Sequence, residues 1–200
     1  MPDDPYVMWC RGELAEHFRL PYDLRIEVLD GVLAVLPALD DSGVGILLDV
    51  ERAVESACSW RVLRQVKVDL AEIENGYIPD LAVVGREAGE CRQMRETVRS
   101  GDLELAVEVT SSFNAENSRR PSLGGSKRAT KWSGYARTGV PYYLLVDRDP
   151  RQPGVTLFGA PDKAEGAYEV LGEWKFGESV RLPEPFGVEI GTDAWRPWSA

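Results

Sequence analysis

The chain contains little histidine and little cysteine: one histidine, His17, and three cysteines among 200 residues. A single imidazole excludes every mechanism that needs two, including that of the His-Glu-x-x-His metalloproteases. Cys10, Cys58 and Cys91 are odd in number, far apart and without a Cys-x-x-Cys pair, so neither a disulfide framework nor a thiolate zinc site is indicated. Carboxylates and lysines must therefore carry any chemistry, and we expect a reducing, cytoplasmic location.

Basic residues are scarce relative to acidic ones. The 23 Lys and Arg residues against 33 Asp and Glu residues give a formal net charge of −10 and an isoelectric point near 4.7. This balance argues against a protein that coats nucleic acid or anionic membrane non-specifically. Long apolar runs are also absent, because the longest, residues 32–39, is about half of what a membrane-spanning helix needs. Since the first residues are acidic and turn-like, we expect neither a signal peptide nor a membrane span.

The remaining composition is that of an ordinary globular domain, with 44% apolar and 28% charged residues. We expect one domain over residues 1–200, with a core over about residues 20–147. Proline and glycine recur every few positions after residue 147, between short apolar runs. This pattern predicts a β-meander over residues 148–200.

Short helices and strands are expected along the core. Residues 25–36 are typical of a hairpin that turns at Asp30-Gly31, because Asp-Gly supplies the positive φ angles of a tight turn. Residues 46–57 are predicted to be helical, because their apolar side chains recur at three and four positions. The other predicted elements are strands at 62–70, 77–84, 103–110 and 142–146, a loop with a short helix at 87–100, and a helix at 126–138.

Two carboxylates stand in apolar, strand-like segments. Glu108 shares a predicted strand face with Ala106 and Thr110. Burying an ionised carboxylate without a partner costs roughly several kcal/mol, so a cation or a metal is expected beside it. Asp80 begins another apolar segment, and such an oxygen-rich pair suits Mg²⁺ or Mn²⁺, because Mg²⁺ takes one or two carboxylates plus waters. The alternative is structural: Asp80 caps a turn and Glu108 pairs with an arginine.

Positive charge gathers in one segment. Residues 117–146 contain no Asp or Glu and carry a net charge of +6, which leaves −16 for the rest of the chain. Such segregation suits an acidic protein that admits a phosphate group, as in DNA, at one place. Lys127, Lys131 and Tyr135 would line one side of the predicted helix, where a lysine offsets charge on a phosphate. The alternative is a solvated helix face. The six basic residues are Arg119, Arg120, Lys127, Arg128, Lys131 and Arg137.

Four segments occur in a recognisable order: RIEVLDG at 25–31, IPDL at 78–81, DLELAVEVTS at 102–111 and KWSGYARTGVPYYLLVD at 131–147. This order resembles the Uma-type (Uma two) restriction endonuclease family of the PD-(D/E)xK nuclease superfamily. The resemblance implies an α/β (α+β) fold: a restriction-endonuclease-like mixed central sheet flanked by helices, with a β-rich C-terminal extension. It also implies an α-β-β-β-α-β core with the site at one sheet edge.

The resemblance assigns roles to three acidic residues. It implies that Asp80 is the motif aspartate and Glu108 the motif acid, both of which bind the metal. Glu27, in the first hairpin, matches an additional acidic position that belongs to the inner or outer shell of the metal. The cofactor implied is Mg²⁺ or Mn²⁺, and the implied substrate is DNA.

The resemblance leaves the choice of lysine open. Lys131 matches the lysine four residues before the Tyr-Ala pair. In the usual superfamily pattern the lysine follows the acid by two residues, but Thr110 holds that position in this sequence. Lys127 and Lys67, the latter on a neighbouring predicted strand, are the other candidates for the same role.

Two functions from different classes follow. The first is a metal-dependent endonuclease in which the two motif carboxylates hold Mg²⁺ and the lysine positions water or stabilises the transition state. The alternative is a catalytically degenerate, non-enzymatic binding or assembly module with the same fold, with the β-rich tail as a homodimer surface. Many relatives have a histidine soon after the first hairpin, and residues 40–45 contain none. A hydrolase of another phosphate or nucleotide substrate is a third candidate.

Overall fold

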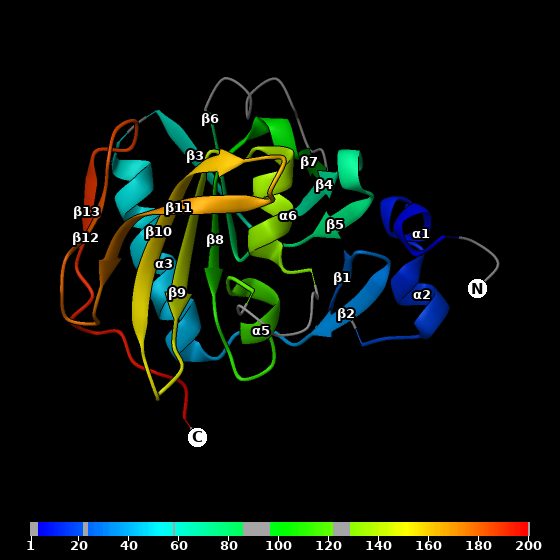
Figure 1. The fold of residues 1–200 in the computed structure, drawn as a ribbon. Coiled ribbons are helices and arrows are strands. Elements are labelled where there is room, and N and C mark those ends of the chain that lie inside the picture. The colour runs from blue at the N-terminus through cyan, green and yellow to red at the C-terminus, as the bar shows by residue number, and fades with distance from the viewer. Residues whose placement is uncertain (1–3, 22–23, 58, 86–96, 122–128, 200) are drawn as a thin grey trace.

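Two mixed β-sheets organise the computed structural model (Figure 1), which describes residues 4–21, 24–57, 59–85, 97–121 and 129–199. Sheet A has the strand order β2 (Val32–Leu36), β1 (Arg25–Leu29), β5 (Asn75–Tyr77), β4 (Lys67–Leu70), β7 (Thr97–Arg99). Sheet B has the order β11 (Ala167–Trp174), β10 (Gly154–Asp162), β9 (Tyr142–Asp147), β8 (Leu103–Val109), β6 (Leu81–Gly85), β3 (Trp60–Arg64). The β4–β7 and β8–β9 pairs are parallel, and the other pairs within these sheets are antiparallel.

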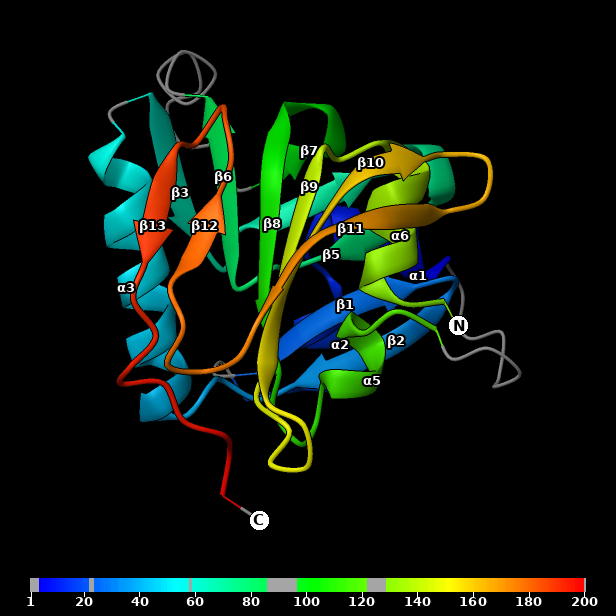
Figure 2. The ribbon, with the colours of Figure 1, turned by 60° about the vertical axis from the view of Figure 1, so that its left-hand side comes forward.

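Sheet B is covered on both faces (Figure 2). Helix α3 (Asp41–Ser56) and the ribbon of β12 (Val180–Leu182) and β13 (Val188–Ile190) share one apolar core with it. Helix α6 (Lys131–Thr138) shares a second core with both sheets. No helix among the described residues is long and apolar enough to cross a membrane. The remaining helices among the described residues are α1 (Pro5–Arg11) and α2 (Leu14–Phe18), which lie near β1, α5 (Ala115–Ser118), and the 3₁₀ turns η1 (Ala71–Ile73) and η2 (Ser100–Asp102).

The predicted hairpin and first core helix are both present. β1 and β2 pair around Asp30 and Gly31, whose φ angles of 45° and 74° are those that an Asp-Gly turn supplies. Helix α3 begins at Asp41, five residues before the predicted start. Asp40 caps it by accepting a hydrogen bond from the Gly43 amide at 2.7 Å. The apolar period begins only at Ile46, so the cap, and not the period, marks the true start.

Two predictions of single strands were wrong, because each segment divides between the two sheets. Residues 62–70 form the end of β3 and then β4, with Gln65 between them at a φ of 49°. Residues 77–84 form the end of β5 and then β6, with Pro79 between them, which cannot donate a backbone hydrogen bond. The β3–β6 pair of sheet B therefore continues as the β4–β5 pair of sheet A.

The predicted tail contributes to the main sheet. β10 pairs with β9 and β11 with β10, so residues 154–174 extend sheet B. The chain is thus an α+β protein with two mixed sheets flanked by helices and a β-rich C-terminal extension. The predicted loop with a short helix at 87–100 lies largely outside the described residues, and its end forms β7 and the first residue of η2.

Helix α6 is shorter than predicted. It begins at Lys131, because Thr130 is the N-cap and forms a capping box with Ser133; residues 126–128 lie outside the described part of the chain. Its end at Thr138 agrees with the prediction, since Gly139 adopts the left-handed conformation with a φ of 76°. The short helix places Lys131 in its first turn, over both sheets.

A close approach at Gly134 holds α6 against sheet A. A Cβ atom at this position would overlap the ring and hydroxyl of Tyr77, whose hydroxyl accepts a hydrogen bond from Asn75 at 2.8 Å. We expect Gly134→Ala to lower the free energy of unfolding by about 1–3 kcal/mol through overpacking. The matched control is Gly45→Ala in α3, where a Cβ meets nothing within 4 Å; there we expect stabilisation of about 0.5–1 kcal/mol. Urea unfolding measures both, and equal shifts in the two variants would contradict this packing role.

Candidate active site

Asp80 lies where the chain passes from β5 in sheet A to β6 in sheet B, and it is fully buried. Both of its carboxylate oxygens have partners. Oδ1 accepts from Arg25 Nη1 at 2.7 Å, and Oδ2 accepts from the Val109 amide at 2.8 Å. Because Val109 follows Glu108 on β8, the second bond ties Asp80 to the strand that carries the other motif acid.

Lys131 joins the two glutamates of the predicted site. Its ammonium lies 2.6 Å from Glu108 Oε1 and 2.7 Å from Glu27 Oε1, and the lysine side chain is 2% exposed. Nζ also donates to the Ile78 carbonyl at 3.4 Å, and the Ile78 amide donates to Glu27 Oε1 at 2.8 Å. Glu27 lies on β1 of sheet A and Glu108 on β8 of sheet B. The structure therefore brings Glu27, Glu108 and Lys131 into direct contact.

Sequence reasoning missed Arg25, the partner of Asp80. Its side chain is 9% exposed, and its Nη2 donates to the Pro37 carbonyl at a long 3.5 Å. Every residue of β1 is buried, so the alternation of Arg25, Ile26 and Glu27 places two charged side chains on one covered strand face. That alternation was the sequence signal that could have identified Arg25. The structural alternative was that Asp80 caps a turn and Glu108 pairs with an arginine. In the structure the arginine, Arg25, pairs with Asp80, and Glu108 pairs with Lys131.

Several buried polar atoms in this cluster have no hydrogen-bond donor or acceptor among the described residues. They include Oε2 of Glu27, Oε2 of Glu108, Nε of Arg25 and the hydroxyl of Tyr135. Oε1 of Glu108 faces the Lys131 ammonium as an ion pair, but the geometry does not meet that of a hydrogen bond. Buried carboxylate oxygens without donors are costly, so a positively charged ligand would have a clear role here.

Burial and the mutual contacts shift the pKa values of the cluster. Burial raises the pKa of the Glu108 carboxyl to about 8, against the lowering effect of Lys131, and the charges of Asp80 and Glu27 add to the rise. For Lys131, burial lowers the pKa, but the carboxylates outweigh it, so the pKa lies above its ordinary value. The lysine thus stays charged at neutral pH while Glu108 retains a proton readily.

While Arg25 holds Asp80, the carboxylates of this cluster that can face a divalent cation are Glu27 and Glu108. Among the described ranges, no group of three or more His, Cys, Asp or Glu side chains is placed to hold a metal ion. Glu27 and Glu108, however, each keep one oxygen without a donor. Mg²⁺ commonly takes one or two carboxylates and completes its shell with water, so the donor set suits it.

The other two lysines do not join this cluster in the described part of the chain. Lys67 donates to the Trp9 carbonyl at 3.3 Å, and its ammonium lies 5.2 Å from the centre of the Trp9 ring. Lys127 lies outside the described residues. Of the two lysine candidates in the described part of the chain, Lys131 is the one that contacts predicted acidic site residues.

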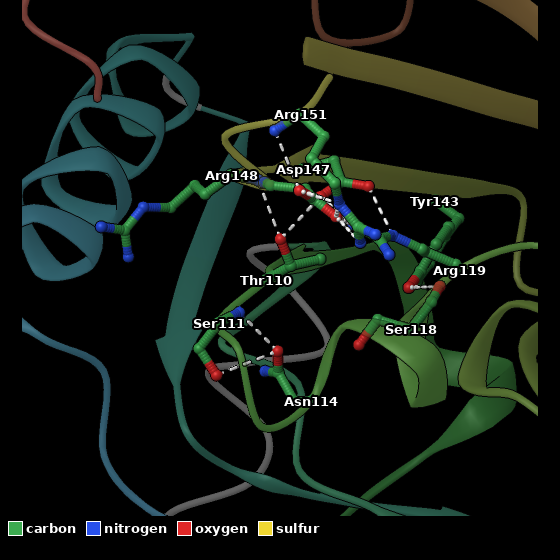
Figure 3. Close-up of polar contacts among 10 residues, drawn as sticks. Thr110, Ser111, Asn114, Ser118, Arg119, Tyr143, Asp147, Arg148 and Arg151 are labelled. Carbon is green, nitrogen blue, oxygen red and sulfur yellow. Dashed lines mark hydrogen bonds and ion pairs between the residues drawn. The ribbon is translucent and has the colours of Figure 1, made fainter. Parts of the chain in front are cut away.

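The position two residues after Glu108 has a different role. The Thr110 hydroxyl donates to Asp147 Oδ1 at 3.0 Å and accepts from the Arg148 amide at 2.8 Å (Figure 3). Arg148 itself extends toward α3, where its guanidinium binds Asp40 at 2.7 Å. Thr110 therefore links the end of β8 to the end of β9. A lysine that acts in this site has to come from another element of the fold.

Carboxylates from elsewhere in the sequence neutralise much of the basic segment. Arg119 donates to Asp147 at 2.6 Å (Figure 3). It also donates to Asp149 at 3.0 Å. Lys131 is buried with its glutamates, and Arg137 lies 3.6 Å from Asp30. The guanidinium of Arg120 stacks over the Trp132 ring, 5.7 Å from its centre. Lys127 and Arg128 lie outside the described residues. At the described positions, the basic residues of this segment therefore do not form one exposed positive patch.

A cavity of about 1100 Å³ lies elsewhere, beside the β9–β10 turn. Arg119, Asp147, Asp149, Arg151 and Trp174 contribute to its walls, and none of the predicted site residues in the described part of the chain does. The cluster is instead enclosed between the two sheets and α6. The cluster lies at one end of the inner strands β6 and β8 and not on an edge strand of sheet B.

Comparisons with known proteins agree with this fold. No curated protein gives a significant match. A solved structure described as "a putative nuclease belonging to DUF820 from Anabaena variabilis" superposes with a TM-score of 0.60 at 14% identity, covering 90% of this chain and 95% of that one. The model of the Uma2 family, described as "Putative restriction endonuclease", matches residues 14–193. A match over nearly the whole chain shows that the chain belongs to the Uma2 family.

Proposed function

We propose that the chain is a metal-dependent endonuclease that hydrolyses phosphodiester bonds in DNA. The observation that carries this proposal is the contact of one buried ammonium with two carboxylates, each of which keeps an oxygen without a donor. The family description and the nuclease-like fold of the Anabaena structure support the same reaction class. The metal would be Mg²⁺ or Mn²⁺.

Asp80, Glu108 and Glu27 would hold the ion in this proposal. When bound, such an ion lowers the pKa of a coordinated water and offsets phosphate charge. The protein's own part is to hold the carboxylates rigidly and to keep an ammonium beside the phosphate. Lys131 is suited to this, because its carboxylate partners keep it charged and fix its position.

Substrate access requires the cluster to open. Glu27, Asp80 and Glu108 have no exposed surface, and Lys131 is 1% exposed. A DNA phosphate reaches these groups only if α6 or the chain beside it moves away from the sheets. We therefore expect cleavage to depend on a conformational step.

Incubation with supercoiled plasmid tests the proposal. With Mg²⁺ or Mn²⁺ the wild-type chain is expected to nick or linearise the plasmid, and Asp80→Asn and Glu108→Gln are expected to reduce cleavage to the level of buffer. Glu104→Gln is the matched control, because Glu104 lies on the same strand, β8, but takes no part in the described cluster. A wild type no more active than the two cluster variants would refute the endonuclease.

One observation favours the second candidate, a non-cleaving binding or assembly module. The cluster already carries internal cations, Arg25 and Lys131, against its three carboxylates, and it is closed to solvent. A purely structural ion-pair network has these properties. Titration calorimetry separates the two functions, since a structural network gives no heat with Mg²⁺ or Mn²⁺ that depends on Glu108. The homodimer expected through the β-rich tail belongs to this second candidate and is tested by the molar mass in solution.

A further inference from the structure

Arg25 is a buried cation that the proposed reaction does not use. Its Nη1 lies 2.7 Å from Asp80 Oδ1, its Nη2 reaches the Pro37 carbonyl only at 3.5 Å, and its Nε has no acceptor among the described residues. The guanidinium is thus held by one short ion pair and little else. Arginines buried for structural reasons usually satisfy more of their five donors.

The position of this guanidinium conflicts with a metal ion on the same carboxylate. Asp80 Oδ2 already accepts from the Val109 amide, whereas the partner of Oδ1 is a side chain that can move away, so Oδ1 is the oxygen better placed to take an ion. Mg²⁺ binds oxygen at about 2.0–2.1 Å, which would place it within about 5 Å of Arg25 Nη1. Repulsion between two cations at that separation is strong in a water-excluded site.

The charge balance of the cluster also favours the release of Arg25 when a metal ion binds. In the deprotonated form that a metal ion requires, the cluster holds three carboxylates against Arg25 and Lys131, a net charge of −1. A divalent ion added to the closed cluster would leave +1 in a buried site, whereas release of Arg25 to solvent would leave zero. Lys131 is the less mobile of the two cations, because two glutamates and a carbonyl hold its ammonium.

We infer that Arg25 is an internal counter-ion that competes with the divalent cation for Asp80. In the metal-free protein it neutralises the aspartate and stabilises the closed cluster, and it must leave Oδ1 when the ion binds. This inference rests on the proposed metal-dependent function. It makes Arg25 a positioning residue that sets the metal affinity, not a group that touches the substrate.

Calorimetric titration of the full chain with Mn²⁺, without DNA, tests the competition. Arg25→Met keeps an unbranched side chain that fills part of the same space and removes the charge. We expect this variant to bind Mn²⁺ at least about tenfold more tightly than the wild type. Its thermal midpoint in EDTA should fall, and the increase of that midpoint on adding Mn²⁺ should be larger than in the wild type.

Arg25→Lys should bind Mn²⁺ about two- to fivefold more tightly than the wild type, because an ammonium matches a carboxylate less well than a guanidinium does. Arg181→Met, which removes an exposed arginine paired with Glu189, is the matched control and should leave the affinity unchanged.

The outcomes separate this inference from the proposed function. If the wild type binds Mn²⁺ in a manner that Asp80→Asn abolishes, but a folded Arg25→Met binds no more tightly, the competition is refuted and the metal site stands. If Arg25→Met does not fold, Arg25→Lys decides: tighter binding than the wild type supports the competition, and equal or weaker binding refutes it. If no chain, including the Arg25 variants, binds Mn²⁺, both proposals fall.

Discussion

Replacing Lys131 with methionine is expected to lower the free energy of unfolding by about 3–5 kcal/mol, because it leaves two buried carboxylates without their shared cation. Methionine fills a similar volume, so the loss reports charge more than packing. Urea unfolding at constant pH measures it. Lys175→Met, which replaces an exposed lysine, is the control and should change stability by less than about 0.5 kcal/mol.

A rescue experiment separates charge from shape in this prediction. Adding Glu27→Gln and Glu108→Gln to the Lys131→Met chain removes the charges that the lysine neutralised. We expect most of the lost stability to return, because paired apolar or neutral replacements of a buried ion cluster are often tolerated. A triple variant as unstable as the single one would mean that the lysine acts through packing alone.

Stability should also depend on pH through Glu108. Its pKa in the folded protein is about 8, above the ordinary value of 4.5, so its contribution is fully present below about pH 4.5 and is lost as the pH rises through 8. We expect the free energy of unfolding to fall by roughly 2–4 kcal/mol between pH 5 and pH 9. The Asp40 carboxyl, whose pKa the Arg148 guanidinium lowers, loses its contribution only under more acidic conditions and does not affect this window.

Glu108→Gln isolates that dependence. The variant lacks the titrating group, so its stability curve over the same pH range should be nearly flat. Chemical unfolding at five or six pH values measures both chains. Parallel curves for the wild type and the variant would show that other groups cause the dependence.

Local sequence patterns predicted the elements that local forces determine. The Asp30-Gly31 turn and strands β8 and β9 follow from turn chemistry and apolar runs, and the structure contains them. The passage of the chain between sheets at Gln65 and Pro79 was not predicted, because both halves of each segment have the same alternation of buried side chains. Which sheet a strand joins depends on distant partners, and one sequence contains no direct record of them.

The cluster was predicted only in part, because some of its contacts join residues that are distant in the sequence. Glu108 was expected to need a cation, since a charge in an apolar strand rarely stands alone, and the resemblance supplied Lys131 and Glu27. Arg25 was missed because its partner lies 55 positions away in the sequence. The basic segment appeared free because the carboxylates that neutralise Arg119 lie outside it, at Asp147 and Asp149.

The lysine at the start of α6 has one more consequence, for motion of the whole molecule. Because Glu27 belongs to sheet A and Glu108 to sheet B, the Lys131 ammonium joins the two sheets at their interior, beside the Arg25–Asp80 ion pair. Amide protons of β1 and β8 should therefore exchange with deuterium at similar rates in the wild type. When Lys131 is replaced, this contact between the sheets is lost and sheet A should open more readily, so the exchange rate for β1 should rise above the rate for β8.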